Sequence, residues 1–279
     1  PFGLCAWSLR HAGARSDFLA WTREKQRALW FSDLLFLGVF LFFLWVRARN
    51  GAISDLEKPM DSAIMASLAR ASFLPPPHPW WGGAALTNYY YFFHLIGGLL
   101  MRVLHTPPAY GYNLVCALFG ALFVAPLWSL CAALTRSLKL GALAAAVVAL
   151  LGHFEPLRQL FVQHNWPLNW WSTSRVIADT TNASPTDTIN EYPAFTLFIG
   201  DAHGHFFALA VAALFFCLCF ALFLPRSQST RLGRVSHRLL VLLLLSALTG
   251  AFVMGNTWDA PLYALLAVAC GVLSLRGQR

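Results

Sequence analysis

Residues 190–224 read NEYPAFTLFIGDAHGHFFALAVAALFFCLCFALFL, and this stretch decides the class of fold. Its last nineteen residues, Phe206–Leu224, carry no charged side chain. A helix of that length crosses the ~30 Å hydrocarbon core of a bilayer, so the run predicts a transmembrane helix. The residues before the run are polar and reactive, and they predict chemistry at the membrane surface.

Four titratable side chains precede this predicted span. They are Glu191, Asp201, His203 and His205. Such groups move protons or hold cations, and their gathering at the mouth of a span is typical of a functional site. On a helix that begins near Gly200, Asp201 and His205 would share one face, and His203 would lie to one side. The alternative is an ordinary helix cap with interfacial histidines.

The composition places the chain in a membrane. Of its residues 58% are hydrophobic and 11% are charged, whereas soluble domains carry about 25% charged residues. The net charge of +8 comes from basic residues between apolar runs, where they orient a protein in the bilayer, so we predict no nucleic-acid partner. Five of the six cysteines lie in apolar runs, which argues against a disulfide framework and a thiolate metal site.

Six apolar runs predict an all-α, polytopic membrane helical bundle. They are Leu29–Val46, Tyr112–Leu134, Leu138–Leu151, Phe206–Leu224, Leu239–Val253 and Ala260–Leu275. We predict a cytoplasmic basic segment at residues 1–28 and a transmembrane domain at residues 29–279. Amphipathic surface helices are expected at Asp61–Phe73 and Tyr89–Leu104. The chain begins without Met and ends directly after an apolar run, so we expect a fragment of a longer protein.

The distribution of charge predicts which loops face outward. With six spans, the loops at residues 47–111, 152–205 and 254–260 lie on one side and contain nine of the twelve acidic residues. The other side collects thirteen of the twenty Lys and Arg residues, and the positive-inside rule makes it cytoplasmic. We therefore expect a multi-pass protein of the plasma membrane whose active face is extracytoplasmic.

The first outer loop contains the candidate catalytic residues. Asp55, Glu57 and Asp61 lie within seven residues, beside Lys58. Crowding raises the pKa of a carboxyl group, while a lysine or a bound cation lowers it, and this balance suits a general base near neutrality. A charged turn after a span would have the same composition.

Further along the same loop are candidates for binding a substrate. They are Asn88, Tyr89, Tyr90, Tyr91 and His94. Tyrosine hydroxyls and ring faces suit a sugar, although an interfacial aromatic belt would also be rich in tyrosine.

The other outer loops add candidate ligands for an anion. Arg175 is suited to bidentate binding of a phosphate, although an arginine beside Trp170 and Trp171 is also an ordinary cation–π anchor. Asn256 and Asp259 lie in the third loop, where Asp259 is alternatively the cap of the next helix.

The cluster before Phe206 allows two kinds of ligand. Asp201, His203 and His205 offer one carboxylate and two imidazoles, a set suited to zinc or manganese, with Glu191 as a further ligand. Alternatively the histidines donate to a phosphate directly, oriented by Asp201. The sequence does not identify a cofactor, but these three residues could bind a divalent cation.

Seven motifs, in order, give the chain a family resemblance. They are EKPMD (57–61), PPPHPW (75–80), NYYYFFH (88–94), SR (174–175), NEYPAF (190–195), GDAHGH (200–205) and NTWD (256–259). They resemble the Chlor_Arch_YYY (DUF2298-type) family of large, uncharacterised membrane proteins, from about Leu29 onward. The usual glycine after the triple tyrosine is Phe92 here.

The order of spans, outer loops and basic turns is similar to that of the GT-C glycosyltransferases. This resemblance implies a sugar donor linked to polyprenyl phosphate, an unidentified acceptor and contact with the lipid bilayer. In that superfamily an acid soon after the first span is the catalytic base, and Asp55, Glu57 or Asp61 occupies the matching place.

Two alternative functions are a transporter and a noncatalytic membrane scaffold. A transporter is expected to carry ionisable or helix-breaking residues at mid-bilayer, and the predicted spans hold almost none. A scaffold would not require acids and histidines gathered on one side.

Overall fold

The computed structural model describes residues 12–177, 187–224 and 231–276. Its elements are α2 (Ala12–Arg49), α3 (Lys58–Arg70), α4 (Phe92–Val103), α5 (Pro108–Thr135), α6 (Leu138–Leu150), α7 (Glu155–Phe161), α8 (Trp170–Thr173), α9 (Pro193–Ile199), α10 (Gly204–Ala221), α11 (Arg231–Gly255), η1 (Thr257–Asp259) and α12 (Ala260–Arg276). The regular secondary structure of the described residues is helical, and two isolated β-bridges lie in the loops. The predicted all-α class is confirmed.

The long helices form a polytopic membrane bundle, as predicted. Within the described residues five helices are long and apolar enough to cross a membrane: Leu29–Arg49, Pro108–Thr135, Gly204–Ala221, His237–Gly255 and Thr257–Leu275. The predicted third span corresponds to α6, whose 13 residues reach only ~20 Å. A sixth span is complete only if α6 continues into α7 across a 95° bend.

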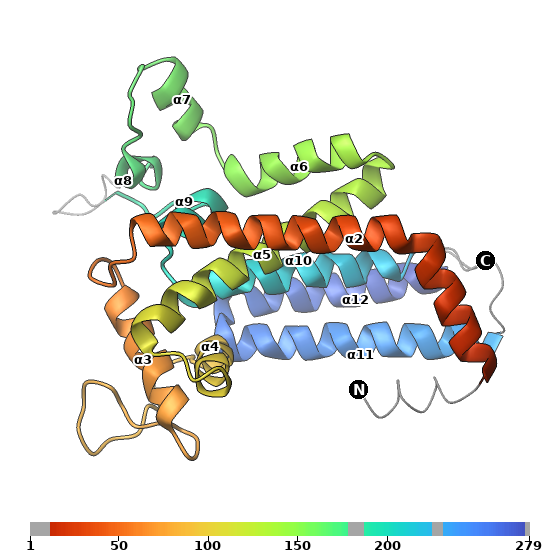
Figure 1. The fold of residues 1–279 in the computed structure, drawn as a ribbon, viewed down its shortest axis with the longest axis horizontal. Coiled ribbons are helices and arrows are strands. Elements are labelled where there is room, and N and C mark those ends of the chain that lie inside the picture. The colour runs from red at the N-terminus through yellow and green to blue at the C-terminus, as the bar shows by residue number, and fades with distance from the viewer. Residues whose placement is uncertain (1–11, 178–186, 225–230, 277–279) are drawn as a thin grey trace.

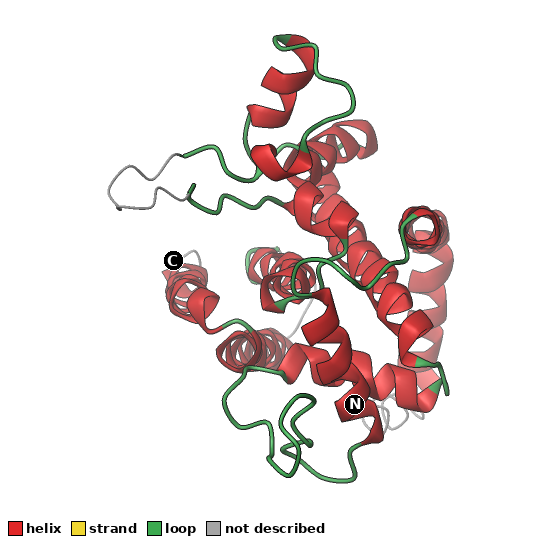
Figure 2. Ribbon diagram, turned by 90° about the vertical axis from the view of Figure 1, so that its left-hand side faces the viewer, coloured by secondary structure: helices red, strands yellow, loops and turns green. Residues whose placement is uncertain are grey.

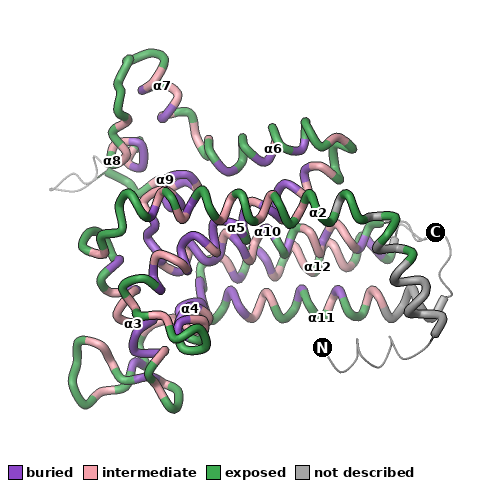
Figure 3. Tube along the Cα trace, in the orientation of Figure 1, coloured by how far each residue is buried: buried purple, intermediate pink, exposed green. Residues whose placement is uncertain are grey.

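Two helices form the centre of the bundle. In α5, 56% of the apolar window is buried inside the protein, whereas in the window of α2 the share is 6%. Helix α5 contacts α2, α6 and α10, and α10 contacts α11. Figure 3 shows this as a buried interior along α5 and α10 and exposed outer helices. The exposed apolar side chains of α2 and α12 suit contact with lipid.

The short helices gather at one end of the bundle. Helices α3, α4, α7, α8 and α9 lie at the end where α2 stops and α10 begins (Figure 1), and Figure 2 looks onto this end. Helices α3 and α4 contact each other and correspond to the two helices expected at Asp61–Phe73 and Tyr89–Leu104. With only 12 residues, α4 is ~18 Å long and too short for a span.

One sequence-based expectation about the decisive stretch is wrong. Helix α9 ends at Ile199, Gly200 follows in the left-handed region at φ 70°, and α10 begins at Gly204 with His203 as its N-cap. Asp201 therefore lies between two helices and shares no helix face with His205. The physical reason is Gly200, because a glycine with positive φ terminates a helix.

The predicted boundary between the basic segment and the transmembrane domain lies inside one helix. Helix α2 runs from Ala12 to Arg49, and the part of it that is apolar enough to cross a membrane begins at Leu29. The division at residue 28 stays a prediction. Residues 1–11 of that segment lie outside the described part of the chain.

Candidate functional site

His203 connects residues 47–111 and 152–205, the two long segments that are predicted to be outer loops. Its Nδ1 lies 2.9 Å from the Tyr89 hydroxyl, and its Nε2 lies 2.9 Å from the Tyr90 hydroxyl. The same Nδ1 is 2.6 Å from Glu57 Oε2 and 3.7 Å from Asp61 Oδ1. The predicted meeting of distant outer loops is thus realised around one imidazole.

Asp61 is a fully buried carboxylate in the first turn of α3. His94 of α4, equally buried, donates from Nε2 to Asp61 Oδ1 over 2.8 Å, while Asp61 Oδ2 has no hydrogen-bond partner. Burial by itself raises the pKa of Asp61, but the neighbouring His203 and His94 outweigh burial and hold that pKa below its ordinary value. The protein thus keeps a charged, incompletely paired carboxylate away from water.

Asp201 lies in the break between α9 and α10. It is 6% exposed, and its Oδ1 has no hydrogen-bond partner. Burial, together with the charge of Asp61, raises the pKa of Asp201 from 3.8 to about 6. Tyr112 of α5 holds the break, because its hydroxyl donates to Gly200 O at 2.9 Å and accepts from the Ala202 amide at 3.0 Å.

Arg47 is a buried residue that the sequence analysis did not select. It is 2% exposed at the end of α2, and its guanidinium donates to Asn113 Oδ1 at 2.8 Å and to Ile199 O at 2.6 Å. It therefore links the first span to the end of α9. Its spacing of four residues from the buried Phe43 is a signal that both lie on the inner face of α2.

Glu191 and His205 form a second acid–histidine pair. Their Oε2 and Nε2 atoms are 3.1 Å apart, and Arg175 Nη1 is 4.0 Å from Glu191 Oε1. Burial raises the pKa of Glu191, but His205 and Arg175 outweigh it and hold the pKa below its ordinary value. Arg175 also lies 4.2 Å from the centre of the Trp171 ring, so the cation–π contact considered for it is present.

The remaining candidates of the first loop have different surroundings. Lys58, 1% exposed, donates to Asp55 Oδ1 at 2.6 Å, and this bond holds the pKa of Asp55 below its ordinary value. Asn88 is exposed. Tyr91 packs against the apolar cluster of Ile64, Leu68 and Leu86 instead of reaching His203.

The third loop lies against the start of α10. The Asn256 side chain donates to Asp259 Oδ2 at 2.8 Å. A Cβ at Gly204 would lie 2.6 Å from Gly255 O, so the backbones of α10 and this loop touch.

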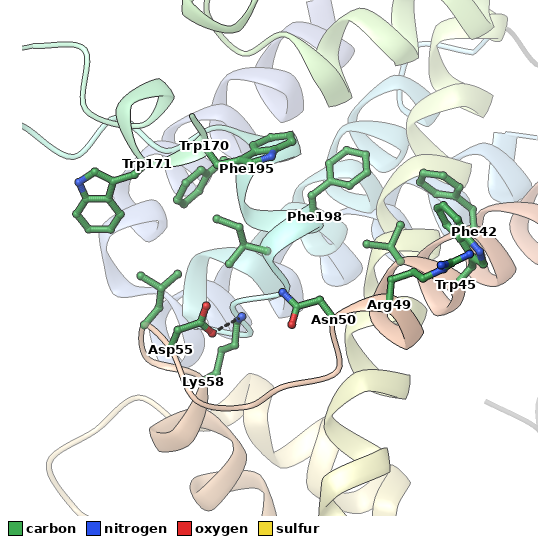
Figure 4. Close-up of a pocket in the computed structure, with 13 residues that line it drawn as sticks. Phe42, Trp45, Arg49, Asn50, Asp55, Lys58, Trp170, Trp171, Phe195 and Phe198 are labelled. Atoms are coloured by element: carbon green, nitrogen blue, oxygen red, sulfur yellow. Dashed lines mark hydrogen bonds and ion pairs between the residues drawn. The ribbon is translucent and has the colours of Figure 1, made fainter. Parts of the chain in front are cut away.

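A pocket of about 670 Å³ is lined by Asp55 and Lys58, which are close in sequence to Glu57 and Asp61. Its aromatic wall comes from α2, α8 and α9, and its polar rim from the end of α2, the start of α3 and the segment between them (Figure 4). The wall contains Phe42, Trp45, Trp170, Trp171, Phe195 and Phe198, and the rim Arg49, Asn50, Asp55 and Lys58. An elongated apolar group with an anionic end would match both parts.

The geometry also groups possible metal ligands. In the part of the chain that the structure describes, Glu57, Asp61 and His203 each present a ligand atom, all within 4.8 Å of one another. This group shares only His203 with the set predicted from the sequence, because His205 turns to Glu191 and Asp201 lies in the break.

Comparisons with known proteins agree with the resemblance drawn from the motifs. No curated protein and no solved structure matches the chain. The profile of one family, described as "Uncharacterized membrane protein (DUF2298)", matches residues 2–279, which is nearly the whole chain. The protein is therefore a member of this family of uncharacterised membrane proteins.

Proposed function

We propose that the protein is a glycosyltransferase that takes a sugar from a polyprenyl-phosphate-linked donor at the outer membrane face. The observation that carries this proposal is the pairing of a buried acid–histidine cluster with the aromatic pocket at the same end of the bundle. The two are adjacent in sequence, because Lys58 lines the pocket and Glu57 contacts His203.

The pocket suits the lipid part of such a donor. A prenyl chain is apolar and matches the aromatic wall formed by residues such as Phe42 and Phe198. The Lys58 ammonium and the Arg49 guanidinium on the rim suit the phosphate, because charge-assisted hydrogen bonds to phosphate are among the strong ones. The sugar would then extend toward the acidic cluster.

The reaction needs a base for the acceptor hydroxyl. A carboxylate takes the hydroxyl proton, the oxygen forms a bond to the anomeric carbon, and the bond from that carbon to the phosphate oxygen breaks. Polyprenyl phosphate leaves with the electron pair, and Lys58 and Arg49 stabilise its charge.

Asp201 is the carboxylate best suited to be that base. General bases work best when their pKa is near the working pH, and the pKa of Asp201 is about 6. The resemblance to GT-C enzymes instead assigns the base to Asp55, Glu57 or Asp61, and that assignment stays a prediction. The pKa values of Asp55 and Asp61 lie below their ordinary value, which makes these two weaker bases.

The experiment is a donor-consumption assay. Purified full-length protein in liposomes is given polyprenyl monophosphate carrying each of the common hexoses, with a mixture of acceptors, and release of polyprenyl phosphate is measured. We expect turnover of at least one donor and a loss of ~10² or more in Asp201→Asn. Glu155→Gln is the control, since Glu155 pairs with Arg158 on α7. A folded wild-type protein that consumes no donor would contradict the proposal.

The outer-face assignment has its own test. Asn165, between α7 and α8, and Lys139, in the first turn of α6, are exposed and lie at opposite ends of the bundle (Figure 1). In a background without native cysteines, an impermeant maleimide should label Asn165→Cys in intact cells and Lys139→Cys only after permeabilisation. Labelling of both positions from one side would overturn the assignment.

A further inference from the structure

Glu57 and Asp61, at the start of α3, meet His203 from a distant part of the chain. Glu57 directly precedes α3, Asp61 is in its first turn, and His203 caps α10. One ligand atom from each lies within 4.8 Å of the others. Two carboxylates and one imidazole are ligand types that manganese and zinc accept.

His203 Nδ1 lies 2.6 Å from Glu57 Oε2, so a proton or a cation must join the two atoms. If the proton is on Nδ1, it is donated to Glu57, and Nε2 accepts from the Tyr90 hydroxyl. If the proton is on Nε2, then Nδ1 has a lone pair that faces Glu57 Oε2 and the Tyr89 hydroxyl. In that second state a cation bound to Nδ1 and Glu57 Oε2 would stabilise the short contact.

Asp61 supplies a second, independent observation. It is fully buried, its Oδ1 is bonded to His94, and its Oδ2 has no hydrogen-bond partner. Buried carboxylate oxygens are normally satisfied, and a missing partner calls for an explanation such as an ion. Asp201 adds another buried oxygen without a partner, and its charge acts on Asp61 and His203.

The nearby side-chain cations are directed elsewhere. Lys58 donates to Asp55, and Arg47 donates to Asn113 and to a backbone carbonyl. The ion pairs that the described structure gives to Glu57 and Asp61 are with imidazoles. The negative charge of Glu57 and Asp61 is therefore not neutralised by a lysine or an arginine, and a bound cation could neutralise it.

We propose that Glu57, Asp61 and His203 bind one divalent cation of the manganese or zinc type. His94 orients the Asp61 carboxylate and the Tyr90 hydroxyl orients His203, as second-shell groups do in metal sites. Because a three-residue ligand set leaves coordination positions free, water or a phosphate oxygen can complete the shell. Metal binding at this site can be measured without a donor or an acceptor, so its test does not depend on the proposed transferase activity.

The test uses the metal alone. Purified full-length protein in detergent is titrated with Mn²⁺, and free Mn²⁺ is followed by electron paramagnetic resonance without any donor or acceptor. We expect one saturable site per chain, displaced by Zn²⁺. Glu57→Gln should weaken binding at least ~10-fold, and it should leave the fold intact, since the Glu57 side chain is 53% exposed. Thermal unfolding of the same samples checks the fold.

Two histidines two residues apart give a matched control. His203→Ala should abolish the site, whereas His205→Ala and Glu191→Gln should keep it. A folded wild-type protein without saturable Mn²⁺ binding would overturn the proposal and leave a protonated His203 as the explanation of its short contact. Undiminished binding in Glu57→Gln, or equal losses in the two histidine variants, would overturn it as well.

Discussion

Two acid–histidine pairs lie at the start of α10, and the protein treats them differently. Asp61 and His94 are completely buried, and one Asp61 oxygen is unpaired. Glu191 and His205 keep 21% and 37% of their side-chain surface exposed and have Arg175 nearby. A half-buried ion pair with an arginine nearby costs little free energy, although His205 Nε2 also makes no hydrogen bond. A fully buried carboxylate without full compensation costs more. Because a buried, incompletely paired carboxylate destabilises the fold, we infer that Asp61 and His94 serve function more than stability.

The largest expected effect is on transfer activity. Asp61→Asn keeps the size of the side chain but removes the charge that faces His203 and His94, so we expect a loss of ~10² or more in kcat/KM. The matched change Glu191→Gln, on the other pair, should change kcat/KM only a few-fold. Both are measured with the donor-consumption assay. Equal losses in the two variants would remove the distinction between the pairs.

The next largest effect is expected on the stability of the protein, when the break between α9 and α10 is changed at Gly200. Gly200 has φ 70°, and a Cβ there would lie 2.7 Å from Arg47 Nη1. Gly200→Ala should therefore be destabilised by about 1–2 kcal/mol from the backbone and roughly 1 kcal/mol or more from the contact. Thermal and denaturant unfolding in detergent measure the change.

Two other glycines separate these contributions. Gly83 also has positive φ, 79°, but a Cβ would meet nothing within 4 Å, and Gly82 has open space and no positive φ. We expect Gly83→Ala to show the backbone effect alone and Gly82→Ala to show almost none. If Gly200→Ala were no worse than Gly83→Ala, Arg47 would not be a tight neighbour of the break.

The break between α9 and α10 also separates what the sequence could predict from what it could not. Uninterrupted apolar runs such as Phe206–Leu224 depend only on local composition, and they predicted five of the six expected spans. The remaining one, α6, is long enough only if it is counted together with α7. The segregation of charge placed the long loops together at one end. Gly200 is a local signal for the end of α9, but the contact that holds this end, from Arg47 to Ile199 O, spans 152 residues of sequence, and no local pattern predicts it.

The candidate site was predictable in part for the same reason. The sequence analysis predicted Asp61, Tyr89 and His203 as site residues, because each is a reactive or aromatic residue in a predicted outer loop. Their partners were not predictable: His94 reaches Asp61, and Tyr91 turns into an apolar cluster. Which neighbours a loop residue meets is set by the packing of α3 on α4 and α10, which local sequence does not specify.

The third prediction concerns pH. The proposed base, Asp201, would act in its ionised form, so kcat/KM should rise with pH through about 6 and level off above it. One unit below that pKa the rate should be about tenfold under the plateau. Stopped assays between pH 4.5 and 8 measure the profile. A base at Asp61, whose pKa is held below its ordinary 3.8, would give a flat profile over this range and would contradict the assignment.

The smallest expected effect tests whether the second pair is an ordinary ion pair. The pKa of Glu191 is lower in the folded protein than its ordinary 4.5. A depressed carboxyl pKa stabilises the fold above the unfolded value, and this contribution is lost as pH falls through the folded value. At pH 7 Glu191→Gln should therefore be less stable than wild type by under about 1 kcal/mol.

This difference should disappear on acidification, because a protonated Glu191 resembles the glutamine of the variant. Chemical unfolding of wild type and Glu191→Gln in detergent, between pH 7 and pH 3, measures the difference directly. A constant difference across that range would assign the effect to packing, since packing does not titrate. If Glu191→Gln lost well above 1 kcal/mol of unfolding free energy at pH 7, the two pairs would not differ as argued. The Glu191–His205 pair would then stabilise the start of α10 as strongly as a buried pair does.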